Sequence, residues 1–100
     1  MIRHIVIWRF ADEADGRGKQ ENLRLARDRL RGMAGRVDGL LNLEVGINEP
    51  PSGEAADLAL VAEFSDWQAL RAYTDHPVHQ EVVRFLRQVR TERRVMDYEI

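Results

Sequence analysis

The segment DLALVAEFSDWQALRAYTDHPVHQ, residues 57–80, changes its hydrophobic period halfway along. From residue 67 onward the apolar residues recur at helical spacing, and we expect Trp67 and Leu70 to pack against a sheet. Before that point they occupy every second position, which is typical of a strand with one buried face: Leu58, Leu60, Ala62 and Phe64. The segment therefore predicts a strand that leads directly into a helix.

Two local signals predict the ends of this helix. Ser65 and Gln68 have the spacing of a capping box, in which the side chain of each residue bonds the backbone amide of the other. Pro77 has no amide hydrogen and disfavours helical backbone at His76, so it should end the helix. Because proline fits the first turn of a helix, Pro77 also predicts the start of another helix, which carries His79 in its first turn.

The rest of the chain completes an alternating order of strands and helices. Residues 11–19 are rich in turn formers and predict a loop, and residues 48–56 contain two prolines and predict a turn between antiparallel strands. Hydrophobic patterns predict the other elements: a strand over 2–10, a helix over 20–37, a strand over 41–47, a helix after Pro77 and a strand over 94–100. The order β-α-β-β-α-β predicts an α+β fold of the ferredoxin-like type, with an antiparallel four-stranded sheet.

This order leaves one face of the sheet without helices. Right-handed crossovers place both helical layers on the same face. The opposite face carries Ile5, Ile7 and Val61, and an exposed apolar patch of this kind usually marks an interface. We therefore expect the chain to pair with itself, as a homodimer formed through the open face of the sheet.

The composition argues against several classes of function. The chain has 100 residues, the size of one domain, and we treat residues 1–100 as a single domain. Its net charge is −2 and its arginines are interleaved with acids, so we expect no nucleic-acid partner. The lack of cysteine removes disulfides and thiolate chemistry, and no apolar run approaches the ~20 residues of a membrane span. With no signal-peptide pattern at residue 1, the expected location is the cytoplasm.

Four stretches of the chain resemble one known family. They are RHIVIWRF (3–10), LEVGIN (43–48), DLALVAEFSDWQALRAYTDHPVHQEVV (57–83) and VMDYEI (95–100), and the motif Y-x-x-H-P-x-H from Tyr73 to His79 is the most specific part. Together they resemble the stress-responsive A/B barrel (Dabb) domain of the dimeric α+β barrel superfamily. The resemblance implies a homodimer in which two ferredoxin-like sheets close into one barrel. It does not imply one function, because the superfamily contains plant stress proteins, a polyketide cyclase, cofactor-free monooxygenases and haem-associated enzymes.

The histidines and one tyrosine are the candidate site residues. His79 stands in the first turn of a helix, where the helix dipole disfavours imidazolium, so a neutral general base is one interpretation. The alternative is that His79 only caps the helix or bonds Tyr73. In the cyclase branch of the family, the matching tyrosine and second histidine form an acid/base pair and a histidine of the first strand lines the pocket. The resemblance thus implies catalytic roles for Tyr73 and His79 and a lining role for His4, while His76 is interpreted as structural.

Two classes of function stay open at this point. One is a stress-associated barrel that binds a small hydrophobic ligand in a pocket lined by His4, Trp8, Leu60 and Phe85. The other is a cofactor-free enzyme, similar to a polyketide cyclase or a monooxygenase, that uses Tyr73 and His79. We expect no metal, because Asp75, His76 and His79 lack a further convergent ligand, and we expect no cofactor. Unlike the cyclase branch, this sequence has no histidine in the third strand, where Leu58 and Leu60 occupy the nearest inward positions, and no tyrosine in the first helix. A more apolar pocket is therefore expected.

Overall fold

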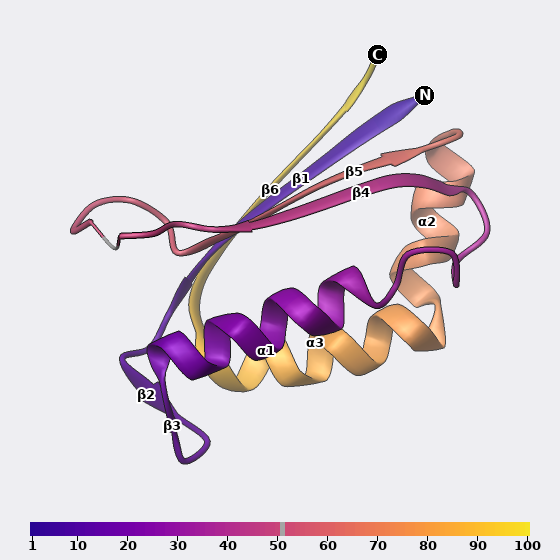
Figure 1. Ribbon diagram of the computed structural model, residues 1–100. Helices are drawn as coiled ribbons and strands as arrows, with labels where there is room; N and C mark the ends of the chain where they lie inside the picture. The colour runs from indigo at the N-terminus through magenta and orange to yellow at the C-terminus, as the bar shows by residue number, and fades with distance from the viewer. Residues whose placement is uncertain (51) are drawn as a thin grey trace.

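A sheet with strand order β4-β5-β1-β6 forms one layer of the fold (Figure 1). The computed structural model describes residues 1–50 and 52–100, so Pro51 of the predicted 48–56 turn lies outside the described residues. β1 (Ile2–Phe10) pairs antiparallel with β5 (Leu58–Phe64) on one side and with β6 (Arg90–Glu99) on the other. β4 (Leu40–Ile47) pairs antiparallel with β5 and forms the other edge. The predicted antiparallel four-stranded sheet is confirmed.

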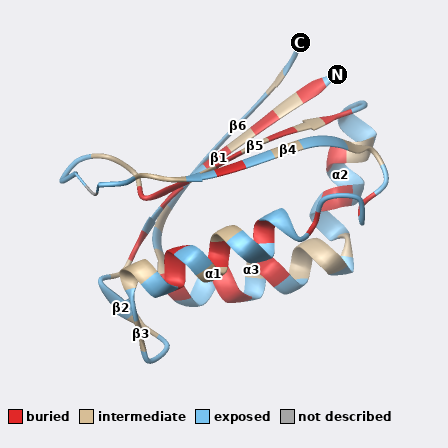
Figure 2. Ribbon diagram, viewed as in Figure 1, coloured by how far each residue is buried: buried red, intermediate tan, exposed pale blue. Residues whose placement is uncertain are grey.

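Within residues 1–50 and 52–100, three helices cover one face of this sheet and none lies on the other face (Figure 1). They are α1 (Lys19–Arg31), α2 (Trp67–Asp75) and α3 (Pro77–Val89). Buried residues (red in Figure 2) lie where the helices and the central strands face each other, whereas most of β6 is exposed. None of the helices in the described part of the chain is long and apolar enough to cross a membrane.

Strand alternation in β1 decides what each face of the sheet contains. Its even-numbered residues point toward the helices and are buried, because they face the hydrophobic core: Ile2, His4, Val6, Trp8 and Phe10. Its odd-numbered residues lie on the open face. There Ile7 keeps 40% of its surface exposed, and Met96 of β6, which pairs with Ile5, keeps 62%.

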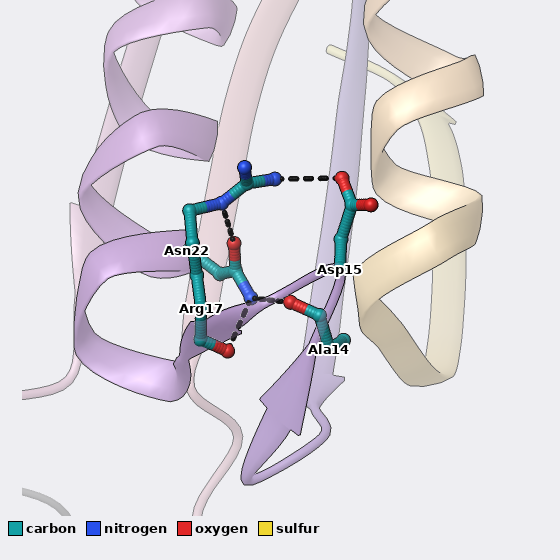
Figure 3. Close-up of polar contacts among 4 residues, drawn as sticks. All are labelled: Ala14, Asp15, Arg17 and Asn22. Atoms are coloured by element: carbon teal, nitrogen blue, oxygen red, sulfur yellow. Dashed lines mark hydrogen bonds and ion pairs between the residues drawn. The ribbon is translucent and has the colours of Figure 1, made fainter.

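The predicted loop over 11–19 contains a short hairpin. β2 (Glu13–Ala14) and β3 (Arg17–Gly18) pair antiparallel around Asp15 and Gly16, which both have positive φ, as this tight turn requires. The buried side chain of Asn22 in α1 fastens the hairpin to the helix (Figure 3). Its Oδ1 accepts from Nε of Arg17 at 2.8 Å, and its Nδ2 donates to the carbonyl of Ala14 at 3.1 Å.

The first helix is shorter than predicted. α1 ends at Arg31 and Gly32 caps it, whereas the apolar stripe had suggested a helix up to residue 37. Met33 and Val37 continue the stripe and are buried, but they lie in turns beyond the helix. The glycines explain the early end, because each costs about 1 kcal/mol in a helix and Gly35 adopts φ +77°, outside the helical region.

The predicted break at Pro77 is confirmed, but the cap of α2 is not the expected one. The carboxylate of Asp66, rather than the Ser65–Gln68 pair, caps the helix by accepting from the amide of Ala69 at 2.8 Å. An aspartate is a strong N-cap because its negative charge also complements the helix dipole. His76 joins α2 to α3 with extended backbone, and its Nδ1 accepts from the amide of Val78 at 3.1 Å.

The prediction that Trp67 packs on the sheet is wrong. Trp67 is the first residue of α2, at one end of the sheet, and 42% of its surface is exposed (Figure 1). The buried side of α2 begins one turn later with Leu70 and continues with Tyr73. Leu70, which was expected in the core, is buried there.

Replacing Leu70 with alanine should lower the free energy of unfolding by about 2–5 kcal/mol, because the truncation leaves a cavity in the core. The same substitution at the exposed neighbour Arg71 should change it by less than about 0.5 kcal/mol. Urea unfolding of both variants at one protein concentration measures the difference. An equal or larger cost at Arg71 would show that the phase of α2 is assigned wrongly.

Candidate functional site

A cavity of about 250 Å³ lies between the sheet and the helices. Strands β1 and β5 supply one wall, with side chains that alternation turns inward: His4, Val6, Trp8 and Leu60. The helices supply the opposite wall, which includes Leu30, Tyr73, His79, Val83 and Leu86. The cavity therefore brings together His4, Tyr73 and His79, the three polar residues singled out in the sequence.

The break at Pro77 brings Tyr73 and His79 into contact. Tyr73 lies in the last turns of α2 and His79 in the first turn of α3, and their ring centroids are 4.1 Å apart at an interplanar angle of 36°. The Tyr73 side chain is almost fully buried, and burial raises the pKa of its phenol well above the ordinary value. At neutral pH the phenol is therefore protonated and can donate a hydrogen bond.

His79 is held as a neutral base with a defined tautomer. Its Nδ1 lies 3.2 Å from the carbonyl oxygen of Thr74, which can only accept, so Nδ1 carries the hydrogen. Burial is the main cause that lowers the pKa of the imidazole, and the charge of Arg93 lowers it further. Nε2 is then the unprotonated nitrogen at neutral pH. Burial therefore favours the neutral state that was predicted for His79.

His4 completes the polar end of the cavity from the sheet. Its Nδ1 is hydrogen-bonded to Oδ1 of Asp97, which lies directly opposite His4 in the register of β1 and β6. Since a carboxylate accepts, Nδ1 of His4 donates and Nε2 is the free ring nitrogen. The edge of the His4 ring faces Tyr73, with centroids 6.0 Å apart. The expected burial of His4 under the helices is observed.

Trp8 contributes a buried donor with no partner. The residue is only 4% exposed and lines the cavity. Within residues 1–50 and 52–100, its indole Nε1 finds no hydrogen-bond acceptor. A buried N–H without a partner is costly, and such groups are often found where a ligand or water supplies the missing acceptor.

Phe85 does not line the cavity, contrary to the expectation from the sequence. Along α3 the cavity is lined by a row that includes His79, Val83 and Leu86, which are spaced by four and three residues. Phe85 is rotated away from that row by one residue, so its ring packs instead beneath the guanidinium group of Arg29, 4.2 Å from the ring centroid.

Three arginines at the cavity were missed in the sequence. Arg87 lies in the last turn of α3, and Arg90 and Arg93 belong to β6, which begins four residues before the predicted start at residue 94. Because no strand was predicted over residues 90–93, the side of the sheet on which these side chains lie could not be predicted. The sequence contained one signal that could have pointed to them: from Arg84 onward, arginine recurs at every third position as far as Arg93.

In the part of the chain that the structure describes, no group of three histidine, cysteine or acidic side chains is arranged to hold a metal ion. Nδ1 of His76 accepts from the amide of Val78, and Nδ1 of His79 bonds the carbonyl of Thr74. One nitrogen of each ring is therefore committed to the backbone.

Comparisons with known proteins place the fold and the family. A crystal structure of a dimeric protein of unknown function with a ferredoxin-like fold, from Bacteroides fragilis, aligns over 99% of this chain and 95% of that chain, with 25% identity and a TM-score of 0.82. Hydroxynitrile lyase from Passiflora edulis aligns over 99% of this chain and 92% of its own, with 14% identity and a TM-score of 0.81. At that identity the lyase shows a shared fold alone.

Sequence comparison identifies the family directly. An uncharacterized protein of Streptomyces coelicolor is 33% identical over 92 residues, which are 91% of this chain and 92% of the relative. The model of the Stress responsive A/B Barrel Domain matches residues 2–100. This chain therefore belongs to the stress responsive A/B barrel (Dabb) domain family.

Proposed function

We propose that this protein is a homodimeric, stress-associated α+β barrel that binds a small hydrophobic or aromatic ligand in the cavity between sheet and helices. The observation that carries the proposal is the cavity itself, whose apolar walls end at Tyr73, His79 and His4. Apolar walls supply affinity for a ligand, and a few polar groups fix its orientation. A solidly packed core would have supported a purely structural role for these residues.

The size of the cavity limits the ligand. Its volume of about 250 Å³ lies just below the range of ~300–1,000 Å³ typical of ligand pockets. A dry engineered cavity of about 150 Å³ holds benzene, so this cavity suits one or two rings with few substituents. Trp8 and Leu60 give it a flat, apolar wall, which favours a planar compound.

The open face of the sheet supports the homodimer. Ile5, Ile7 and Val61 lie on this face, together with Met96 from β6. A chain of 100 residues gains stability when a second copy covers such a surface. The Bacteroides fragilis protein with the same fold is described as dimeric.

A cofactor-free enzyme, cyclase-like or monooxygenase-like, is the second candidate. The specific observation in its favour is the contact between a protonated phenol and a neutral imidazole at one end of the cavity. The Tyr73 hydroxyl can donate to a substrate carbonyl and stabilise an oxyanion, while Nε2 of His79 takes a proton from the adjacent carbon or hydroxyl. The lyase of Passiflora edulis is an enzyme on the same fold, so the fold is compatible with catalysis.

Replacing His79 with alanine should abolish or weaken ligand binding without unfolding the protein, because the half-buried ring contributes polar contacts to the cavity. Thermal shift with a panel of phenols and β-diketones measures this, since a ligand that binds the folded state raises the melting temperature. His76→Asn is the matched control, because asparagine keeps a good helix cap and His76 does not line the cavity. If His79→Ala unfolds and no compound raises the melting temperature of the wild type, His79 is a structural residue.

Ile7→Arg should convert the dimer into a monomer that remains folded, because it places a charge in the centre of the proposed interface. Trp67→Arg is the control, since Ile7 and Trp67 are 40% and 42% exposed but only Ile7 lies on the open face. Size-exclusion chromatography with light scattering gives the mass of each variant. A wild-type monomer at micromolar concentration would falsify the homodimer.

The free energy of unfolding should decrease as the pH falls, because protonation of His79 destabilises the folded state. The folded state lowers the pKa of this group, whereas the unfolded chain titrates near pH 6.5, so the unfolded chain binds the proton more readily. The contribution of neutral His79 is fully present above about pH 6.5 and is lost as pH falls through the lower folded pKa. Urea unfolding should therefore show a smaller loss of stability for His79→Gln than for the wild type between about pH 7 and pH 5. If the free energy of unfolding changes equally with pH in the two proteins, the His79 ring is not buried as described.

A further inference from the structure

The three arginines give the cavity a charge that the proposed function does not use. Arg87, Arg90 and Arg93 all line it, whereas none of its described lining residues is aspartate or glutamate. Among residues 1–50 and 52–100, no ion pair involves any of these three guanidinium groups. The nearby Asp97 is already hydrogen-bonded to His4, so it only partly offsets their charge.

An irregularity in strand pairing turns two of these arginines to the same face. Trp8 pairs with Arg93 and Arg9 with Glu92, but Phe10 pairs with Arg90, so Thr91 is an extra residue in β6. In a regular strand, residues three positions apart point to opposite faces. The bulge reverses this for Arg90, which joins Arg93 on the helix side of the sheet. Bulges of this kind often direct side chains at a site.

The polar groups of the cavity are mostly donors. Besides the arginines, the Tyr73 hydroxyl is protonated and the indole Nε1 of Trp8 is buried without an acceptor. Partial burial and the charge of Arg90 lower the pKa of Arg93, whose side chain is otherwise exposed. A neutral hydrocarbon would leave the Trp8 donor without an acceptor and would bring no counter-charge to the arginines. A ligand with negative oxygen atoms would satisfy them.

We propose that the ligand is a small aromatic carboxylate, held through its carboxylate by Arg93 and Arg90, with its ring against Trp8 and Leu60. The planar guanidinium group matches a carboxylate with two parallel hydrogen bonds. The ring then extends from the sheet edge toward Tyr73 and His79. This inference rests on the proposed function, because it assigns the chemical class of the ligand to the same cavity.

The test compares two ligands of the same shape and different charge. The dissociation constants of 2-naphthoate and 2-naphthamide for the wild type are measured by isothermal titration calorimetry. We expect 2-naphthoate to bind at least about tenfold more tightly than 2-naphthamide, because a hydrogen bond to a charged group adds that much affinity. Arg93→Gln should remove this preference and leave the affinity for the amide within about twofold. Arg90→Gln should reduce the preference as well, and it keeps the test informative if Arg93→Gln does not fold.

Arg94→Gln is the matched control for the charge change. Arg94 is adjacent to Arg93 in sequence but pairs with Ile7, so it lies on the open face, away from the cavity. This variant should bind 2-naphthoate like the wild type. Equal binding of both compounds by the wild type overturns the carboxylate and leaves the ligand cavity standing. If neither compound binds but a phenol of the earlier panel does, the proposed carboxylate ligand is wrong and the ligand cavity stands. If no compound binds, both the carboxylate and the proposed function are wrong.

Discussion

The ring of Pro77 is the constraint on which the arrangement of the site depends, because it disfavours helical backbone at the preceding residue. It leaves His76 in extended backbone between α2 and α3, with a ring that caps the second helix. A continuous helix would separate positions 73 and 79 by six residues and turn them to different faces. The break instead stacks Tyr73 on His79 over the sheet. Residues 73–79 therefore build both the break between the helices and the polar end of the cavity, so a change in one affects the other.

The register of the central strand is the second determinant. β1 turns His4 and Trp8 into the cavity, and its pairing with β6 sets Asp97 opposite His4 and Arg93 opposite Trp8. Asp97 fixes the tautomer of His4, and the bulge near Phe10 brings Arg90 to the face of Arg93. The cavity thus has a basic edge at β6, an apolar middle and a tyrosine–histidine end. That gradient of polarity would orient the proposed ligand, which has one anionic end and one flat apolar body.

The parts of the fold that could be predicted are those governed by local chemistry. The alternation from Leu58 to Phe64 gave a strand, Pro77 gave the helix break, and together with the β-α-β-β-α-β order these patterns led to the correct sheet. Local patterns failed where tertiary contacts decide. Trp67 has helical spacing but is exposed at the start of α2, and Phe85 is one residue out of phase with the cavity. The facing of Arg90 depends on a bulge, which hydrophobic periodicity does not report.

We propose that Tyr73, His79 and His4 form a preorganised polar end of a ligand cavity. Long-range proton–nitrogen NMR of the histidine rings is the decisive test, because the spectrum reports the tautomer and protonation of each ring. We expect a neutral His79 at neutral pH with its hydrogen on Nδ1, and a change in its Nε2 signal when 2-naphthoate or a phenol is added. A His79 ring with its hydrogen on Nε2, unchanged by every ligand, would show that no such polar end exists.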